Sequence, residues 1–330
     1  MKKFGIGIFI SLFFIFLLAN KFDREVFNKV WALANLYYII PAVFIQLMGL
    51  FFSSLRWFVL LKKQLPLKHA ISCSVIGGGG NMVLPARGGD LFRMYYCKYE
   101  AEIPYFSLLS RLFLEKVMDF VYVILIGILA FTYLQVQNQS TGNYTIFTVL
   151  GIITLGVFIG LYLLRFQNAW LHKIAKFLFN KLGREEFFHK HISQHLQELE
   201  SFLQIKNLLI PLLLTMSIWL FYSIVYYILP MALGMQFSYE QAVFILFMAA
   251  MSMAVPSAPS GIGVFHASVL SGFIILALPE QQGLVFATLA HFFNFLVASL
   301  SGLVFYLYWM YKRRHGKPVN LQEVQNSIEQ

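Results

Sequence analysis

Charged residues are scarce in this sequence. Asp, Glu, Lys and Arg make up only 12% of its 330 residues, whereas 59% are hydrophobic. A soluble domain would carry about 25% charged residues, so the composition excludes a soluble globular fold and predicts a polytopic helical membrane protein. The formal net charge of +10 is typical of basic cytoplasmic loops that face anionic lipid. Nucleic acid is the poorer explanation, because the basic residues are dispersed between hydrophobic segments.

Cysteines and catalytic motifs are also rare. The only cysteines, Cys73 and Cys97, lack the spacing of a metal site, and the topology derived below predicts free thiols facing the cytoplasm. There is no serine nucleophile elbow, Walker loop, zinc signature or pair of catalytic carboxylates. His191 and His195 lie at i,i+4, but no carboxylate or thiol completes a metal site. We therefore expect no metal and no cofactor, and these absences count against an enzyme.

Six apolar stretches are predicted to cross the bilayer. They are Phe4–Ala19, Leu36–Leu61, Val117–Leu134, Ile146–Leu164, Leu208–Leu233 and Leu284–Tyr311. The first is long for a signal peptide and ends in a poor cleavage site, so we interpret it as an uncleaved span. Together the stretches predict an all-α polytopic bundle, with residues 1–311 as one membrane domain and 312–330 as a polar cytoplasmic tail.

Two further apolar segments, Ala70–Glu102 and Ala242–Ala277, are interrupted by glycine and proline. In the first, the run Gly77–Gly80 lets backbones pack closely and Pro85 ends the first half-helix, and the second is broken at Val255–Gly263. Irregular backbone at membrane depth is tolerated only where protein or a water-filled cavity surrounds it. We therefore predict two re-entrant broken helices, each of which enters and leaves the membrane on one side.

The distribution of Lys and Arg predicts the orientation of these segments. Lys2 and Lys3 place the N-terminus in the cytoplasm, and the basic run Lys312–Lys317 places the C-terminus there, which suits the cytoplasmic (inner) membrane. With six full spans, the first broken segment then opens to the cytoplasm and the second to the outside. Under this scheme the basic residues that lie outside are Lys21, Arg24 and Lys29.

This order makes the halves 1–141 and 144–311 alike, because each reads as span, span, re-entrant helix, span. Three full spans per half turn the second half upside down, so we predict an inverted repeat. Paired broken helices in inverted halves usually mark a transport site near the midplane. Residues 170–204 carry an apolar stripe opposite lysines, which predicts an amphipathic cytoplasmic helix in the headgroup plane; a solvated linker helix is the alternative.

The first broken segment carries the first group of candidate site residues. Arg87, Asp90 and Arg93 follow the break at i, i+3 and i+6. A guanidinium is a planar fork of donors suited to phosphate, so the two arginines could hold a lipid phosphate while Asp90 orients them. The alternative is an internal Arg–Asp pair that neutralises charge beside the turn, and the two interpretations are compatible.

A second group enters the third span. Arg111, Glu115 and Asp119 lie at i,i+4 spacing on one helical face, whereas Lys116 lies off that face and is expected to snorkel. The functional interpretation is a charged lining for a headgroup path or a cation relay. The structural one is a ladder of ion pairs that locks the hairpin, which we favour for Arg111 and Glu115. Asp119 lies deepest, which favours a functional role.

The second broken segment carries the third group, Pro259, Gly261, Gly263 and His266. The amides of Gly261–Val264 begin a half-helix, which is a natural anion site. His266 could donate to a phosphate or titrate, although a lone histidine in a membrane helix is more often a packing residue. In the last span, His291 and Asn294 are interpreted as polar contacts between helices.

Three motifs in order resemble the flippase-like membrane domain of the lysylphosphatidylglycerol synthase family. They are NMVLPARGGDLFR at 81–93, RLFLEKVMD at 111–119 and PSGIGVFH at 259–266. The resemblance covers nearly the whole chain and implies a helical bundle with re-entrant segments that admits phospholipids, or in some relatives polyprenyl or hopanoid lipids. The family often has Glu at Asp90 and an acid at His266, so a carboxylate role at His266 is not carried over. Nothing after Tyr311 could be the synthases' aminoacyl-transferase domain, so we do not expect aminoacylation.

We therefore expect a lipid flippase or scramblase-like protein that translocates an anionic phospholipid or other phosphate-bearing lipid. The headgroup would lie between the two broken segments, on Arg87, Arg93 and the Gly261–Val264 amides. A membrane lipid-modifying transferase or its accessory subunit, and a small-solute secondary transporter, are the alternatives. A homo-oligomer and a separate lipid-modifying enzyme are left open as partners.

Overall fold

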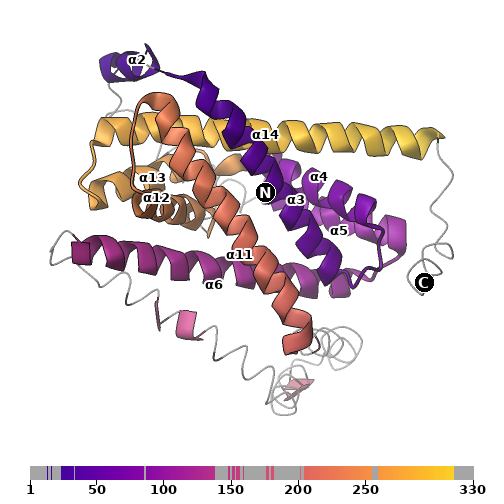
Figure 1. Cartoon of the computed structure of the whole chain (residues 1–330). Helices are drawn as coiled ribbons and strands as arrows, with labels where there is room; N and C mark the ends of the chain where they lie inside the picture. The colour runs from indigo at the N-terminus through magenta and orange to yellow at the C-terminus, as the bar shows by residue number, and fades with distance from the viewer. Residues whose placement is uncertain are drawn as a thin grey trace.

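The computed structural model describes residues 24–32, 34–84, 87–137, 204–254 and 259–315, with isolated helical positions between and before these ranges. Every regular element in these ranges is a helix (Figure 1), so the chain is an all-α bundle. The predicted spans Phe4–Ala19 and Ile146–Leu164, and the predicted amphipathic segment 170–204, lie almost wholly outside the described residues. Most of the predicted tail, 316–330, also lies outside them.

Four helices of the described ranges are long and apolar enough to cross a bilayer. They are α3 (Ile39–Leu60), α6 (Tyr105–Gln137), α11 (Ile205–Ile228) and α14 (Glu280–His315). Short 3-10 turns, η1 (Leu36–Tyr38) and η4 (Leu229–Leu233), extend α3 and α11 at their adjoining ends. These helices match four of the six predicted spans.

Helix α6 is longer than the predicted span Val117–Leu134. It begins directly after Pro104, whose carbonyl accepts a hydrogen bond from the amide of Leu108 at 3.1 Å. Proline is well suited to the start of a helix, because a missing N–H costs nothing there. The added N-terminal turns bring Arg111, Glu115 and Lys116 into the bundle. Hydropathy alone had placed the start of the span after these residues, at Val117.

Both predicted breaks are present, and each separates two short helices. The first hairpin consists of α4 (Leu67–Val83) and α5 (Gly88–Ala101). The second consists of α12 (Tyr239–Met251) and α13 (Val264–Ile275), joined through η5 (Ser252–Ala254) and η6 (Pro259–Gly261). A membrane-spanning helix needs about 20 residues, so none of the four is long enough to cross alone. A short helix α2 (Arg24–Ala32) precedes α3 and contacts α14.

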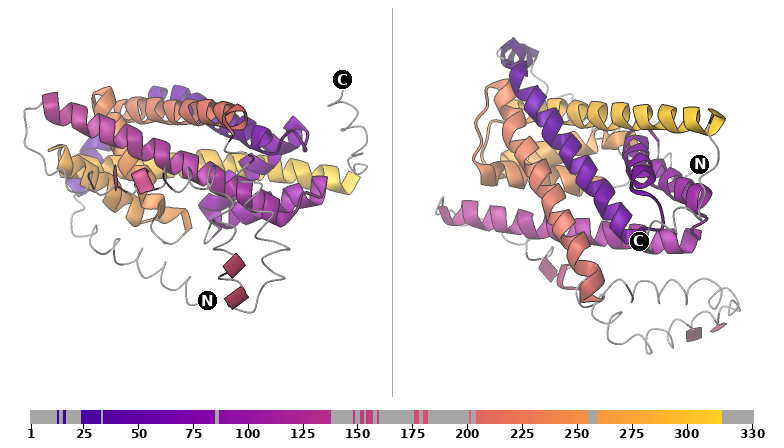
Figure 2. Two further views of the ribbon diagram at one scale, coloured as in Figure 1. Left: turned by 90° about the horizontal axis from the view of Figure 1, so that it is seen from below. Right: turned by 45° about the vertical axis from the view of Figure 1, so that its right-hand side comes forward.

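The two halves exchange equivalent contacts. Helices α3 and α11 lie side by side and run in opposite directions (Figures 1 and 2), and the amide of Asn35 before α3 donates to the carbonyl of Ala232 after α11 at 2.8 Å. Helix α14 packs on α4, and α6 packs on α12. Each half therefore places its last long helix against the first hairpin helix of the other half. This pattern agrees with the predicted inverted repeat.

Glycine permits a close backbone contact where α4 crosses α14. A methyl group added to Gly79 would lie 2.6 Å from the carbonyl oxygen of Ala298 and 2.8 Å from the Cα of Gly302. Both neighbours are backbone atoms, which cannot move aside as a side chain can. By contrast, a methyl group on Gly78 would meet nothing within 4 Å. Within the glycine run, Gly79 therefore permits the close contact with α14, whereas Gly78 lies next to open space.

We expect Gly79→Ala to destabilise the protein and Gly78→Ala to leave it unchanged or slightly more stable. Overpacking at Gly79 should cost about 1–3 kcal/mol. Removing a helical glycine elsewhere gains about 0.5–1 kcal/mol. Thermal unfolding of both variants in the same detergent measures the difference. Equal midpoints for the two variants would contradict the close crossing of α4 and α14.

Candidate functional site

Arg93 of α5 and Glu115 of α6 form a buried ion pair. The two terminal nitrogens of Arg93 donate to the two carboxylate oxygens of Glu115 at 2.9 and 3.3 Å, and both residues are at most 4% exposed. The guanidinium carbon also lies 4.0 Å from the centroid of the Trp57 ring. Of the two interpretations given for Arg93, this geometry matches the internal ion pair rather than a phosphate site. The closest partner is Glu115, whereas Asp90 was predicted.

A second ion pair involves Arg56, which the sequence analysis missed. Its terminal nitrogens donate to the two carboxylate oxygens of Asp119 at 2.7 and 2.9 Å, and one of them also donates to the hydroxyl of Thr215 at 2.8 Å. Arg56 is 2% exposed. It is the one charged residue in the predicted span Leu36–Leu61, and an isolated charge in such a span is a functional candidate by default. That signal could have identified it.

The two pairs belong to one ladder of alternating charge. Arg56 also lies 3.9 Å from Glu115, and Arg93 lies 3.9 Å from Asp90. The order is therefore Asp119, Arg56, Glu115, Arg93, Asp90, contributed by α3, α5 and α6. Removing a charge from water is costly, and each buried arginine of the ladder offsets that cost by facing two carboxylates.

At Asp90 the ladder ends beside two cations that are more exposed than it is, Arg87 and Lys116, and these three residues are called the exposed end below. Asp90 accepts a hydrogen bond from the side-chain amide of Asn81, and its own backbone amide donates back to Asn81, both at 3.0 Å. Lys116, expected off the face of Glu115, lies 3.6 Å from Asp90 and 3.5 Å from Glu115, and its side chain stays 35% exposed. Arg87 lies 3.9 Å from Asp90. The Arg87 and Lys116 side chains are 47% and 35% exposed.

Positive charge is in excess in the ladder and the residues that flank it at Asp90. The ladder and its flanking residues contain four cations but three carboxylates, so one positive charge is not balanced within them. Arg87 itself has a left-handed backbone, with φ of 58°, and caps the start of α5. Its side chain and that of Lys116 therefore flank Asp90 from two different helices, in an arrangement that is open to a ligand.

Arg111 lies one turn before Glu115 on the same face of α6, as its spacing predicted. It is 3% exposed, and it donates to the side-chain oxygen of Gln64 at 3.0 Å. Gln64 lies in the loop between α3 and α4. This contact links α6 to that loop, so Arg111 has a partner outside the charge ladder.

The second broken segment meets the first, because η6 contacts α4. Ser260, Gly261 and Gly263 all have positive φ, which lets the chain turn sharply between η6 and α13. Pro259 begins this turn. The structure therefore places η6, and with it Gly261, beside α4, in a segment that carries none of the ladder charges.

His266 lies in the first turn of α13, where its ring centroid is 5.0 Å from that of His291. His291 approaches the carbonyl of Ser260 at 3.0 Å through its Nε2, and Asn294 accepts a hydrogen bond from Gln46 at 3.2 Å. The predicted roles of His291 and Asn294 as contacts between helices are thus confirmed. Among the described residues, the Nδ1 of His266 has no hydrogen-bond partner.

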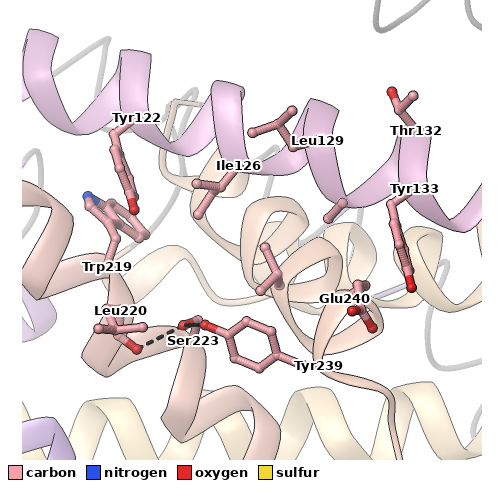
Figure 3. A pocket seen from close by; sticks show the side chains of 12 residues that line it. Tyr122, Ile126, Leu129, Thr132, Tyr133, Trp219, Leu220, Ser223, Tyr239 and Glu240 are labelled. Carbon is pink, nitrogen blue, oxygen red and sulfur yellow. Dashed lines mark hydrogen bonds between the residues drawn. The ribbon is translucent and has the colours of Figure 1, made fainter.

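An open groove of about 570 Å³ lies between α6, α11 and α12. Figure 3 shows its side chains, which are mainly apolar or aromatic, with Glu240 at one end. The hydroxyls of Ser223 and Tyr239 lie 2.6 Å apart in its wall. Trp219 lines the groove and its indole nitrogen donates to Asp119 at 3.0 Å. The groove therefore begins where the charge ladder ends, and nothing in the sequence pattern predicted it.

The pattern of broken hairpins, charges and groove can now be compared with known proteins. The family model of the lysylphosphatidylglycerol synthase TM region matches residues 5–302. The chain belongs to this family. Searches of curated proteins and of solved structures return no significant match. Family membership and the membrane-spanning helices establish a multi-pass membrane protein with a lipid-related function.

We expect Arg56 and Asp119 to be strongly coupled in stability. Arg56→Met or Asp119→Leu alone leaves a charge without its partner, which should cost roughly 3 kcal/mol of unfolding free energy. The double variant should lose clearly less than the sum of the two single variants. Unfolding in detergent measures the cycle, with Arg314→Met at the exposed end of α14 as control. Simple additivity would show that the pair is not energetically linked.

Proposed function

We propose that this protein moves an anionic phospholipid, or a related phosphate-bearing lipid, across the cytoplasmic membrane as a flippase or scramblase. Membership of a lipid-related membrane family supports this proposal. The observation that carries it is the meeting of the charge ladder and the apolar groove at Trp219. A phospholipid has the same two parts, a charged headgroup and an apolar tail. No enzymatic step is part of the proposal.

The headgroup phosphate would bind at the Asp90 end of the ladder, away from Trp219. On α6, Lys116 precedes the first groove residue, Tyr122, by six residues, which is about 9 Å along the helix axis, so one lipid could extend from this end into the groove. Arg87 and Lys116 share Asp90 between them and keep about half or a third of their surface exposed. A phosphate could therefore replace Asp90 as their partner, while the buried Asp90 would keep Asn81 and Arg93. Arg93 is less suited to this role, because Glu115 already occupies both of its terminal nitrogens. This assigns the phosphate to Arg87 and Lys116 rather than to Arg87 and Arg93.

The tail would lie in the groove. Its wall on α6 extends from Tyr122 to Tyr133, which corresponds to about 16 Å along a helix axis. One leaflet of the hydrocarbon core is about 15 Å thick, so the groove matches the length of one acyl chain region. With both termini in the cytoplasm, α6 runs outward, and the ladder lies toward the cytoplasmic end of the groove. That is the orientation of a lipid in the inner leaflet.

The shape and lining of the groove also favour lipid transport over small-solute transport. A solute carrier would hold its substrate in an enclosed pocket lined by polar groups. The groove is open and its lining is mainly apolar. A transferase would need a reactive group beside the headgroup, whereas the ladder offers cations and carboxylates that are paired with one another. Lipid movement therefore fits the geometry better than either alternative.

We expect Arg87→Gln and Lys116→Gln each to slow lipid movement about tenfold or more, because a charge-assisted hydrogen bond to phosphate contributes about 1.5–3 kcal/mol. The assay is quenching of a fluorescent phosphatidylglycerol in liposomes that contain the purified protein. Arg314→Gln is the matched control for loss of an exposed cation. If the wild type moves no lipid but takes up a soluble anion, the proposed function is wrong.

We expect Ala130→Phe to block the groove without disturbing the ladder. Ala130 lines the groove and is 7% exposed, so a phenyl ring there would occupy the space proposed for the acyl chain. A phospholipid with a photoreactive acyl chain should label the 122–133 segment of the wild type, and this labelling should be lost in the variant. Ala32→Phe, on the exposed surface of α2, is the control. Equal labelling of both variants would place the tail elsewhere.

A further inference from the structure

The hairpin of α4 and α5 has a regular antiparallel register. Its facing positions recur about every four residues along each helix, which is one helical turn. From the tip outward, the contacts join Gly80 to Gly89, Gly77 to Arg93, Cys73 to Cys97, and His69 to Tyr96 and Glu100. The cysteines therefore occupy the middle of the hairpin, one turn away from Arg93.

The two sulfur atoms face one another. Cys97 Sγ lies 3.8 Å from Cys73 Sγ, and both residues are fully buried. They are free thiols, as predicted for the cytoplasmic side. A disulfide needs a sulfur–sulfur distance of about 2.05 Å, so closure requires an approach of less than about 2 Å. Rotation of the two side chains can supply part of that approach, because no other residue lies between the sulfurs.

We propose that Cys73 and Cys97 form a redox modification site, at which a small oxidant closes a disulfide that links α4 to α5. With diamide as the oxidant, one thiol adds to the N=N bond and the second sulfur then attacks the first. The S–N bond breaks as the S–S bond forms, and the hydrazine product retains both thiol protons and both electrons. A dithiol reductant reverses the reaction.

The position of the pair gives the disulfide a structural consequence. Arg93 lies one turn before Cys97 on α5, and Asp90 lies nearly one further turn toward the tip. A covalent link at Cys97 would hold α5 in its present register on α4. It would therefore hold the exposed end of the charge ladder in place, so that oxidation would restrain α5 against α4.

The test uses the full-length protein in liposomes, treated with diamide and then denatured with N-ethylmaleimide present. The chain has two cysteines, so mass spectrometry reads the result directly. We expect no maleimide adduct after diamide and two adducts after subsequent reduction. Two adducts after diamide, at a concentration that oxidises the same protein when denatured, would overturn the proposal. A disulfide-linked dimer on a non-reducing gel would overturn it as well.

A displaced thiol is the matched control. Combining Cys97→Ser with Lys98→Cys moves the thiol by about 100° around α5, away from Cys73. This variant should keep two maleimide adducts after diamide, and an intramolecular disulfide in it would show that facing geometry is not required. Hydrogen exchange gives a second readout. In the wild type, amides of residues 67–101 should exchange more slowly after oxidation, and Cys73→Ser should abolish that change.

Discussion

Burial of charge inside an apolar bundle is the constraint on which this structure depends. Arg56, Arg93 and Glu115 are nearly inaccessible to solvent, and an isolated charge there would be costly. Each is held by a two-pronged ion pair and by a second charge at about 4 Å. Satisfying these pairs requires α3, α5 and α6 to approach one another at fixed heights. The ladder thereby links the long helices α3 and α6 to α5 of the first hairpin.

A second constraint comes from the irregular backbone of the two hairpins, which must be accommodated inside an apolar bundle. Glycine at the α4–α5 and α4–α14 contacts lets backbones meet without side chains between them. These contacts pack α4 directly against α5 and α14 on the two sides of the first break. The second hairpin reaches α4 through η6. The two hairpins are therefore in direct contact with one another.

The charge ladder and the groove are different in character but physically joined. Trp219 contributes an apolar ring to the groove and an N–H to Asp119. Asp119 in turn accepts both prongs of Arg56. One aromatic side chain is thus the boundary between a charged region and an apolar one. A molecule with one charged end and one apolar end can contact both regions at once, which is the physical basis of the proposed lipid site.

The sequence alone determined the fold class, the four described long helices, the positions of both breaks and the charged face of α6, because these depend on local hydropathy, proline and glycine, and helical spacing. It also indicated that His291 and Asn294 make contacts between helices. Tertiary structure decided which charges pair. Arg56 meets Asp119 across 63 positions, and Trp219 reaches the same carboxylate across 100. Lys116 turns toward Asp90 because α5 crosses α6 there. Spacing along one helix carries no information about such crossings, and the groove, formed by three separate helices, exists only once they are packed.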